Sequence, residues 1–248
     1  MCDLCVRNAT VDNQPSSPSR RVALGMLGAI PLFGISSATL AANKKTPPKP
    51  ANVLSPDQAI KRLMAGNKRY TSGKTQYRKF AATRDALAAK QNPYACVLGC
   101  ADSRVSPELC FDEERGDLFV TRVAGNYVTN DILASLEYGV RALKSPLIMV
   151  LGHTQCGAID AAVSAYEKHT EYPGHIQNIV TAVMPSVRAA ANKHQGSLLR
   201  AAILENIRHN VQQLQNATPI LSSAVRSGEV KIVGGLYTLE TGQVELVA

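Results

Sequence analysis

Three short apolar runs constrain the fold of this chain more than any other feature. Each is bounded by residues that end regular structure, and the runs cover residues 94–99, 118–124 and 147–152. Continuous apolar runs of this length are typical of strands that are buried on both faces of a parallel sheet. A helical repeat separates the second run from the third, so the pattern indicates βαβ units with right-handed crossovers.

Helices are expected around these strands. Ser55 is the predicted N-cap of a first helix, with Pro56 at its first position, a capping box to Gln58 and an end at Gly73. A second, polar helix is expected at about 76–90, and further helices at about 156–167, 174–193 and 197–217. A strand is expected at about 230–238, and a turn at 240–242 predicts a final edge strand at 243–247. We therefore predict one α/β domain with a Rossmann-like, mostly parallel β-sheet, flanking helices and one antiparallel edge strand.

The ends of the apolar runs are where a functional site is expected. In open parallel sheets, ligands bind beyond the carboxyl ends of the strands, which here means after Gly99, Ala124 and Gly152. Two of these three positions are followed by ligands that favour soft metals. The sequence Cys-Ala-Asp-Ser-Arg begins at Cys100, and His-Thr-Gln-Cys-Gly begins at His153.

Two thiolates and one imidazole are a common ligand set for Zn²⁺. Neighbouring strand ends bring Cys100, His153 and Cys156 within reach of a common point, and three protein ligands leave a fourth position open, as in catalytic zinc sites. The alternative is structural, because cysteine is often buried as a small apolar residue and a single histidine is often part of a core. The joint position at two strand ends favours the metal site.

Asp102 and Arg104 lie two residues apart in the first of these loops. As a pair they are candidate catalytic residues, because the guanidinium can hold the carboxylate while the carboxylate accepts a hydrogen bond from a metal-bound hydroxide. The same spacing also suits a salt bridge that only braces the loop.

The amino-terminal segment has the pattern of an export signal. Ser19-Arg20-Arg21 precedes a stretch without charged residues, from Val22 to Asn43, that ends in small residues. The adjacent arginines favour the twin-arginine route. We predict a signal peptide over residues 1–42, a proline-rich linker over 43–54 and the folded domain over 55–248, in a periplasmic or otherwise exported protein without stable membrane contact after cleavage. An uncleaved membrane anchor is the alternative, since about 20 apolar residues span a bilayer.

The net charge of +8 permits a nucleic-acid partner but does not favour one. The basic residues are scattered, aromatic residues make up 5% of the chain and tryptophan is absent, so the sequence offers little stacking surface for single strands. We expect no nucleic acid among the partners.

The two ligand motifs together resemble those of the β class of carbonic anhydrases. The resemblance extends from about residue 58 to the C-terminus and includes segments at 66–70, 116–120, 122–126 and 135–138. It implies reversible hydration of CO₂ to bicarbonate and a proton through a zinc-bound hydroxide. It also implies one Zn²⁺ per chain, held by Cys100, His153 and Cys156.

The resemblance extends to other site residues. In the family's active form Asp102 pairs with Arg104, and in an inactive form Asp102 takes the fourth zinc position. The substrate pocket would include Gln91, Phe119 and Tyr138, partly supplied across a dimer interface, which implies a homodimer or a higher even-numbered oligomer. From periodicity alone, Phe119 and Tyr138 are interpreted as core residues.

Two other functions stay open at this point. Related proteins of this fold hydrolyse COS or CS₂ on a similar zinc site, and a non-catalytic module that binds zinc or bicarbonate would carry the same three ligands. The intact Asp102 and Arg104 favour an enzyme over such a module. The bicarbonate pocket that regulates some family members uses a tryptophan, which this chain lacks.

Overall fold

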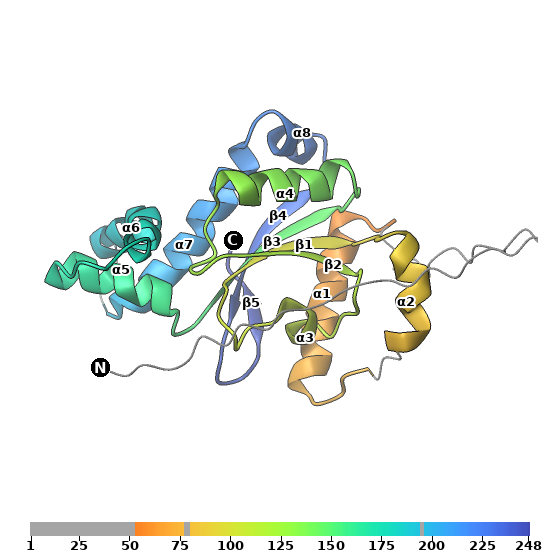
Figure 1. Cartoon of the computed structure of the whole chain (residues 1–248), viewed down its shortest axis with the longest axis horizontal. Helices are drawn as coiled ribbons and strands as arrows, with labels where there is room; N and C mark the ends of the chain where they lie inside the picture. Colours follow the sequence, from red (N-terminus) through yellow and green to blue (C-terminus); the bar gives the residue numbers. More distant parts are fainter. Residues whose placement is uncertain (1–52, 77–79, 194–195) are drawn as a thin grey trace, which may run out of the picture. The chain divides into compact units, whose positions relative to one another are not determined.

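A five-stranded sheet organises the part of the chain that the computed structural model describes, which is residues 53–76, 80–193 and 196–248 (Figure 1). In spatial order its strands are β2 (Leu118–Arg122), β1 (Ala95–Gly99), β3 (Leu147–His153), β4 (Lys231–Tyr237) and β5 (Val244–Leu246). The first four are parallel, and β5 pairs antiparallel with β4. The predicted fold class is confirmed.

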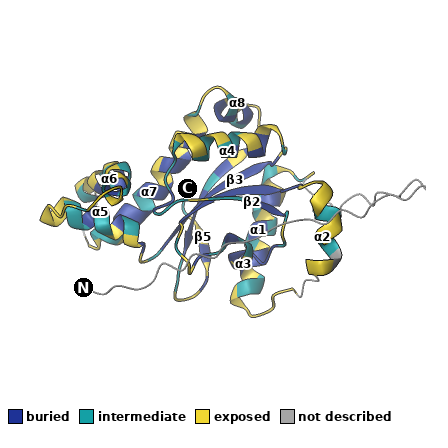
Figure 2. Cartoon of the chain, viewed as in Figure 1, coloured by how far each residue is buried: buried dark blue, intermediate teal, exposed yellow. Residues whose placement is uncertain are grey.

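The central strands are buried on both faces, as their continuous apolar runs predicted. Every residue of β1 and β3 is buried, and Figure 2 shows the strands as the dark centre of the fold. Alternate side chains enter two separate cores. Cys96 and Leu98 contribute to one core, and Ala95 and Val97 to the other.

Helices cover both faces of the sheet. On one face lie α4 (Asn130–Arg141) and α7 (Leu198–Asn216), with α8 (Ile220–Arg226) packed on both of them. Two more helices, α5 (Gly157–Lys168) and α6 (Ile176–Lys193), pack against α7 on the same side (Figure 1). The opposite face is covered by α1 (Pro56–Thr71) and α3 (Pro107–Cys110).

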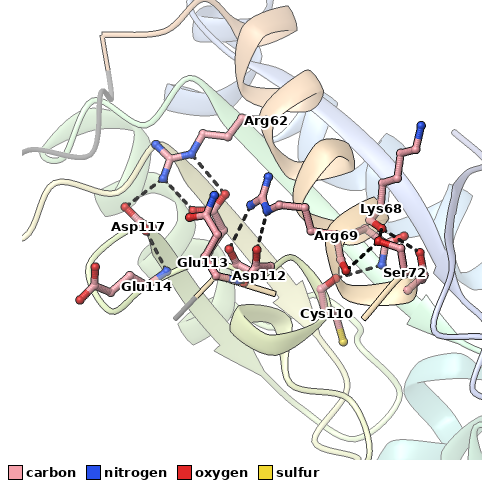
Figure 3. Close-up of polar contacts among 12 residues, drawn as sticks. Arg62, Lys68, Arg69, Ser72, Cys110, Asp112, Glu113, Glu114 and Asp117 are labelled. Carbon is pink, nitrogen blue, oxygen red and sulfur yellow. Dashed lines mark hydrogen bonds and ion pairs between the residues drawn. The ribbon is translucent and has the colours of Figure 1, made fainter. Parts of the chain in front are cut away.

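Ion pairs anchor α1 to the segment between α3 and β2 (Figure 3). Arg62 Nη2 lies 2.7 Å from Glu113 Oε2 and 3.2 Å from Asp117 Oδ1, and Arg69 pairs with Asp112. The predicted capping box at Ser55 is present. The paired carboxylates are buried, so these ion pairs tie α1 to the core that Ala95 and Val97 enter.

Two short helices were not predicted from the sequence. One is α3, which has four residues, and the other is α8, which has seven, so neither is long enough for an apolar repeat to stand out. The second predicted helix corresponds to α2 (Phe80–Ala89). The predicted signal peptide and most of the predicted linker lie outside the described residues. Among the residues that are described, no helix combines the length and apolar character needed to cross a membrane.

Candidate metal centre

Cys100, His153 and Cys156 come together at the carboxyl ends of β1 and β3. Cys100 directly follows β1, His153 is the last residue of β3 and Cys156 is the N-cap of α5. These two strands are parallel neighbours, which aligns their ends. One ligand atom from each residue lies within 4.8 Å of the others, and the two sulfur atoms are 4.0 Å apart.

The donor atoms of this group fit a metal ion. His153 Nδ1 lies 2.8 Å from the carbonyl oxygen of Thr154 and donates its proton there, which leaves a lone pair on Nε2. His153 is fully buried, and its Nε2 has no hydrogen-bond partner. An unsatisfied buried polar atom is costly, and coordination of Zn²⁺ by this nitrogen and two sulfurs would remove that cost.

Local electrostatics favour the thiolate that metal binding requires. The hydrogen bond from the Cys156 thiol lowers the pKa of Cys100 to about 4, against the opposing effect of burial. The neighbouring Cys100 sulfur and burial raise the pKa of Cys156. The two sulfurs lie in hydrogen-bond contact, and binding of a metal ion by both would release the thiol protons that remain on them.

Gly125 provides a contact at the remaining predicted strand end, directly after Ala124. Its backbone N–H donates to Cys100 Sγ at 3.3 Å. Its φ of +87° is left-handed, and an added Cβ would lie 3.3 Å from Ala158 Cβ and 3.4 Å from Val183 Cγ1. Glycine is the residue that fits this backbone and this space. The sequence analysis located the strand end but did not assign Gly125 a role.

Asp102 and Arg104 form a bidentate pair beside the three ligands. Asp102 Oδ2 lies 2.7 Å from Arg104 Nη2, and Oδ1 lies 2.9 Å from both Nε and the backbone N of Arg104. These hydrogen bonds hold the pKa of Asp102 well below its usual range. The same Oδ2 is 3.8 Å from His153 Nε2, so an ionised carboxylate lies next to the ligand group while Arg104 holds it.

Arg122, at the end of β2, braces the loop that carries these residues. Its Nε donates to the carbonyl oxygen of Cys100 at 2.8 Å, and its Nη2 donates to those of Asp102 at 2.6 Å and Val105 at 2.9 Å. One guanidinium therefore fixes the backbone of Cys100 and Asp102 together. Sequence analysis did not single out this residue, although an arginine at the end of a predicted strand is an available signal.

The three residues expected in the substrate pocket lie elsewhere in the chain. Phe119 pairs in register with Cys96, which is four residues, or about 13 Å, from Cys100 along the strand direction. Its ring centroid is 6.2 Å from that of Tyr138, which is 52% exposed. Gln91 is exposed before β1. The geometry of one chain does not bring these residues to its own ligand group.

Comparison with known proteins gives a consistent family. A family model described as carbonic anhydrase matches residues 95–244. A carbonic anhydrase of Mycolicibacterium smegmatis is 38% identical over 192 residues, which are 77% of this chain and 93% of that protein. Carbonic anhydrase 2 of Mycobacterium tuberculosis is 38% identical over 194 residues, with 77% and 92% covered.

Solved structures agree with these sequence matches. The β-carbonic anhydrase CcaA is similar with a TM-score of 0.59 and 29% identity, covering 76% of this chain and 98% of that one. The Coccomyxa β-carbonic anhydrase, solved in complex with acetazolamide, is similar with a TM-score of 0.57 and 31% identity, covering 76% and 81%.

Proposed function

The chain belongs to the β-class carbonic anhydrase family, and from this we infer that it catalyses the reversible hydration of CO₂ to bicarbonate and a proton. The observation that carries this inference is the convergence of Cys100, His153 and Cys156 around an unpartnered His153 Nε2. Zinc, which this class uses, supplies Lewis acidity when bound and lowers the pKa of water so that a nucleophile forms near neutral pH.

The chain's own groups orient the reacting water. Arg104 holds the Asp102 carboxylate and lowers its pKa, so the carboxylate is ionised near neutral pH and accepts a hydrogen bond. A carboxylate with so low a pKa is a poor base. We therefore assign Asp102 to orientation of the water and Arg104 to orientation of Asp102, while the released proton passes to buffer.

The direct test is CO₂ hydration by the purified protein, followed by stopped-flow together with metal analysis. The expected result is about one zinc per chain, as for a single three-ligand centre, and hydration far above the buffer background. Protein that contains this zinc but does not hydrate CO₂ would contradict the proposed function. The alternative that the chain is a non-catalytic zinc-binding module would then be favoured.

A second copy of the chain is proposed to complete the substrate pocket. Within the described residues β2 is an edge of the sheet, and its side chains at Phe119 and Val120 are only half-buried. The adjoining Tyr138 is largely exposed. A partner that covers this edge would bury these rings, and in return the pocket of each copy would receive Gln91, Phe119 and Tyr138 from the other.

Complementation tests this shared pocket. We expect Cys100→Ser and Phe119→Ala variants to be weakly active or inactive alone, and their co-expression to recover part of the activity. In a mixed dimer, one intact ligand group meets an intact Phe119 from the other copy. Light scattering would give the mass of the assembly. Absence of recovery in a demonstrated mixed dimer, or an active monomer, would contradict the proposal.

Export through the twin-arginine route is proposed from Arg20 and Arg21 before the uncharged stretch. This route carries folded protein, so zinc could occupy Cys100 and Cys156 before an oxidising compartment reaches their thiols. When the full chain is expressed in a bacterium with this translocase, we expect the cleaved chain to appear in the periplasm, and the paired change Arg20→Lys and Arg21→Lys to abolish export. Export in a strain without the translocase would contradict the route, and intact chain in the membrane fraction would favour the uncleaved anchor.

A further inference from the structure

Two asparagines interrupt the buried apolar face of α7. Asn206 is 2% exposed and Asn210 is 1% exposed. Their neighbours on this face are apolar and comprise Ala202, Ile203, Ile207, Val211 and Leu214. Asparagine is a poor residue for a helix interior, and a buried amide is costly unless it is hydrogen-bonded. The partners of these two amides therefore indicate what they contribute.

Both amides bind the backbone of the loop that follows β2. Asn206 Nδ2 donates to the carbonyl oxygen of Gly125 at 2.9 Å, and the N–H of Val128 donates to Asn210 Oδ1 at 2.7 Å. Asn210 Nδ2 also donates to Asn206 Oδ1 at 3.2 Å and to the backbone oxygen of Asn206 at 2.8 Å. Because the Asn206 oxygen is engaged in this way, its NH₂ group must face Gly125.

This loop also contacts the ligand group through Gly125. The N–H of Gly125 donates to Cys100 Sγ, while the carbonyl oxygen of the same residue accepts from Asn206. Glycine has little conformational preference of its own, so the direction of this N–H depends on what holds the residue. Gly125 therefore links the Asn206 amide on α7 to the sulfur of a metal ligand.

We propose that Asn206 is a positioning residue for the metal centre, which holds Gly125 so that its N–H stays on Cys100 Sγ. This inference rests on the proposed zinc function. In a buried site, one N–H donor stabilises the negative charge of the sulfur and fixes the direction of its lone pairs. Without Asn206, the Gly125 carbonyl loses its buried partner and the loop is free to rotate the N–H away. The centre then binds metal less tightly.

Asn67 provides a matched control on the opposite face of the sheet. It is also a buried helical asparagine, 4% exposed, and its amide also binds backbone groups. Its Nδ2 donates to the carbonyl oxygens of Cys110 at 2.9 Å and Gly242 at 2.8 Å, and its Oδ1 accepts from the N–H of Val244 at 2.9 Å. Asn67→Ala therefore removes comparable hydrogen bonds without touching the ligand group.

The test compares Asn206→Ala and Asn206→Leu with Asn67→Ala in the full chain. Zinc affinity is measured by competition with a chelator. We expect the zinc affinity of the Asn206 variants to fall by about tenfold or more, as when other hydrogen-bond partners of metal ligands are removed. In the Co²⁺-substituted protein, the sulfur-to-cobalt charge-transfer band is expected to shift in the Asn206 variants only. Leucine is close to asparagine in shape, so the Asn206→Leu variant removes the hydrogen bonds without leaving a cavity.

Thermal unfolding with and without zinc separates positioning from stability. We expect Asn67→Ala to lower the melting temperature equally in both forms, and the Asn206 variants to lose part of the increase that zinc produces. Asn206 variants with the zinc affinity and cobalt spectrum of Asn67→Ala would overturn the proposal. Failure of the wild-type chain to bind zinc, or to hydrate CO₂ when zinc is bound, would instead overturn the proposed function.

Discussion

A Cys100→Ser variant is expected to lose bound zinc and CO₂ hydration together. A serine hydroxyl is not ionised near neutral pH and is a poor ligand for zinc, so only His153 and Cys156 would remain. His153→Ala is expected to have the same effect, because it removes the only nitrogen of the group. Hydration should fall to the buffer background, measured by stopped-flow on samples whose zinc content has been determined.

Cys96→Ser is the matched control for this loss. Cys96 is fully buried in β1, and its side chain enters the same core as that of Cys100. Burial raises the pKa of its thiol to about 12, so it stays protonated. We expect this variant to lose stability but to retain zinc and activity. Full hydration by a zinc-free Cys100→Ser protein would contradict the assignment of the centre.

An Asp102→Ala variant is expected to retain zinc but to lose turnover by about a hundredfold, the effect expected when a reacting group is no longer correctly oriented. Asp102 is not one of the three converging ligands, so the metal stays. Arg104→Ala should lower turnover for a different reason. Without the guanidinium, the carboxylate that now lies 3.8 Å from His153 Nε2 is free to compete for the open metal position.

Because the two residues act as a unit, the double variant is expected to be no slower than the slower single variant. Ser103→Ala, at the exposed residue between them, serves as the control and should retain normal turnover. Zinc content and the turnover number are measured for all four proteins. Normal turnover in Asp102→Ala would show that the pair only braces the loop, and additive losses in the double variant would show that the two residues act independently.

The fold was largely predictable because its signals are local. The strands β1 and β3 are continuous apolar runs since both of their faces are buried, and α1 carries its own capping box. The exceptions also have local causes. α3 and α8 are too short to display an apolar repeat.

The candidate site was predictable only in part. Cys100 and His153 follow strand ends that the sequence itself marks, so their meeting is a consequence of parallel pairing. Asn206 was missed, although an asparagine pair spaced four residues apart in an apolar helical face is an available signal. Phe119 and Tyr138 were interpreted as core residues from periodicity, and their packing on each other with Tyr138 exposed fits neither a closed core nor the same chain's metal group.

The sequence alone determined the alternation of strands and helices, the ligand types and their positions at strand ends, because these depend on neighbouring residues. Only the tertiary structure decided which atom of His153 is free, which donor faces Cys100 and which amide holds that donor. Gly125 and Asn206 are 81 residues apart, and their contact exists because α7, which packs on β3 and β4, also reaches the loop that follows β2. Hydrogen bonds between residues far apart in the sequence depend on how the helices pack against the sheet, and local sequence does not predict that packing.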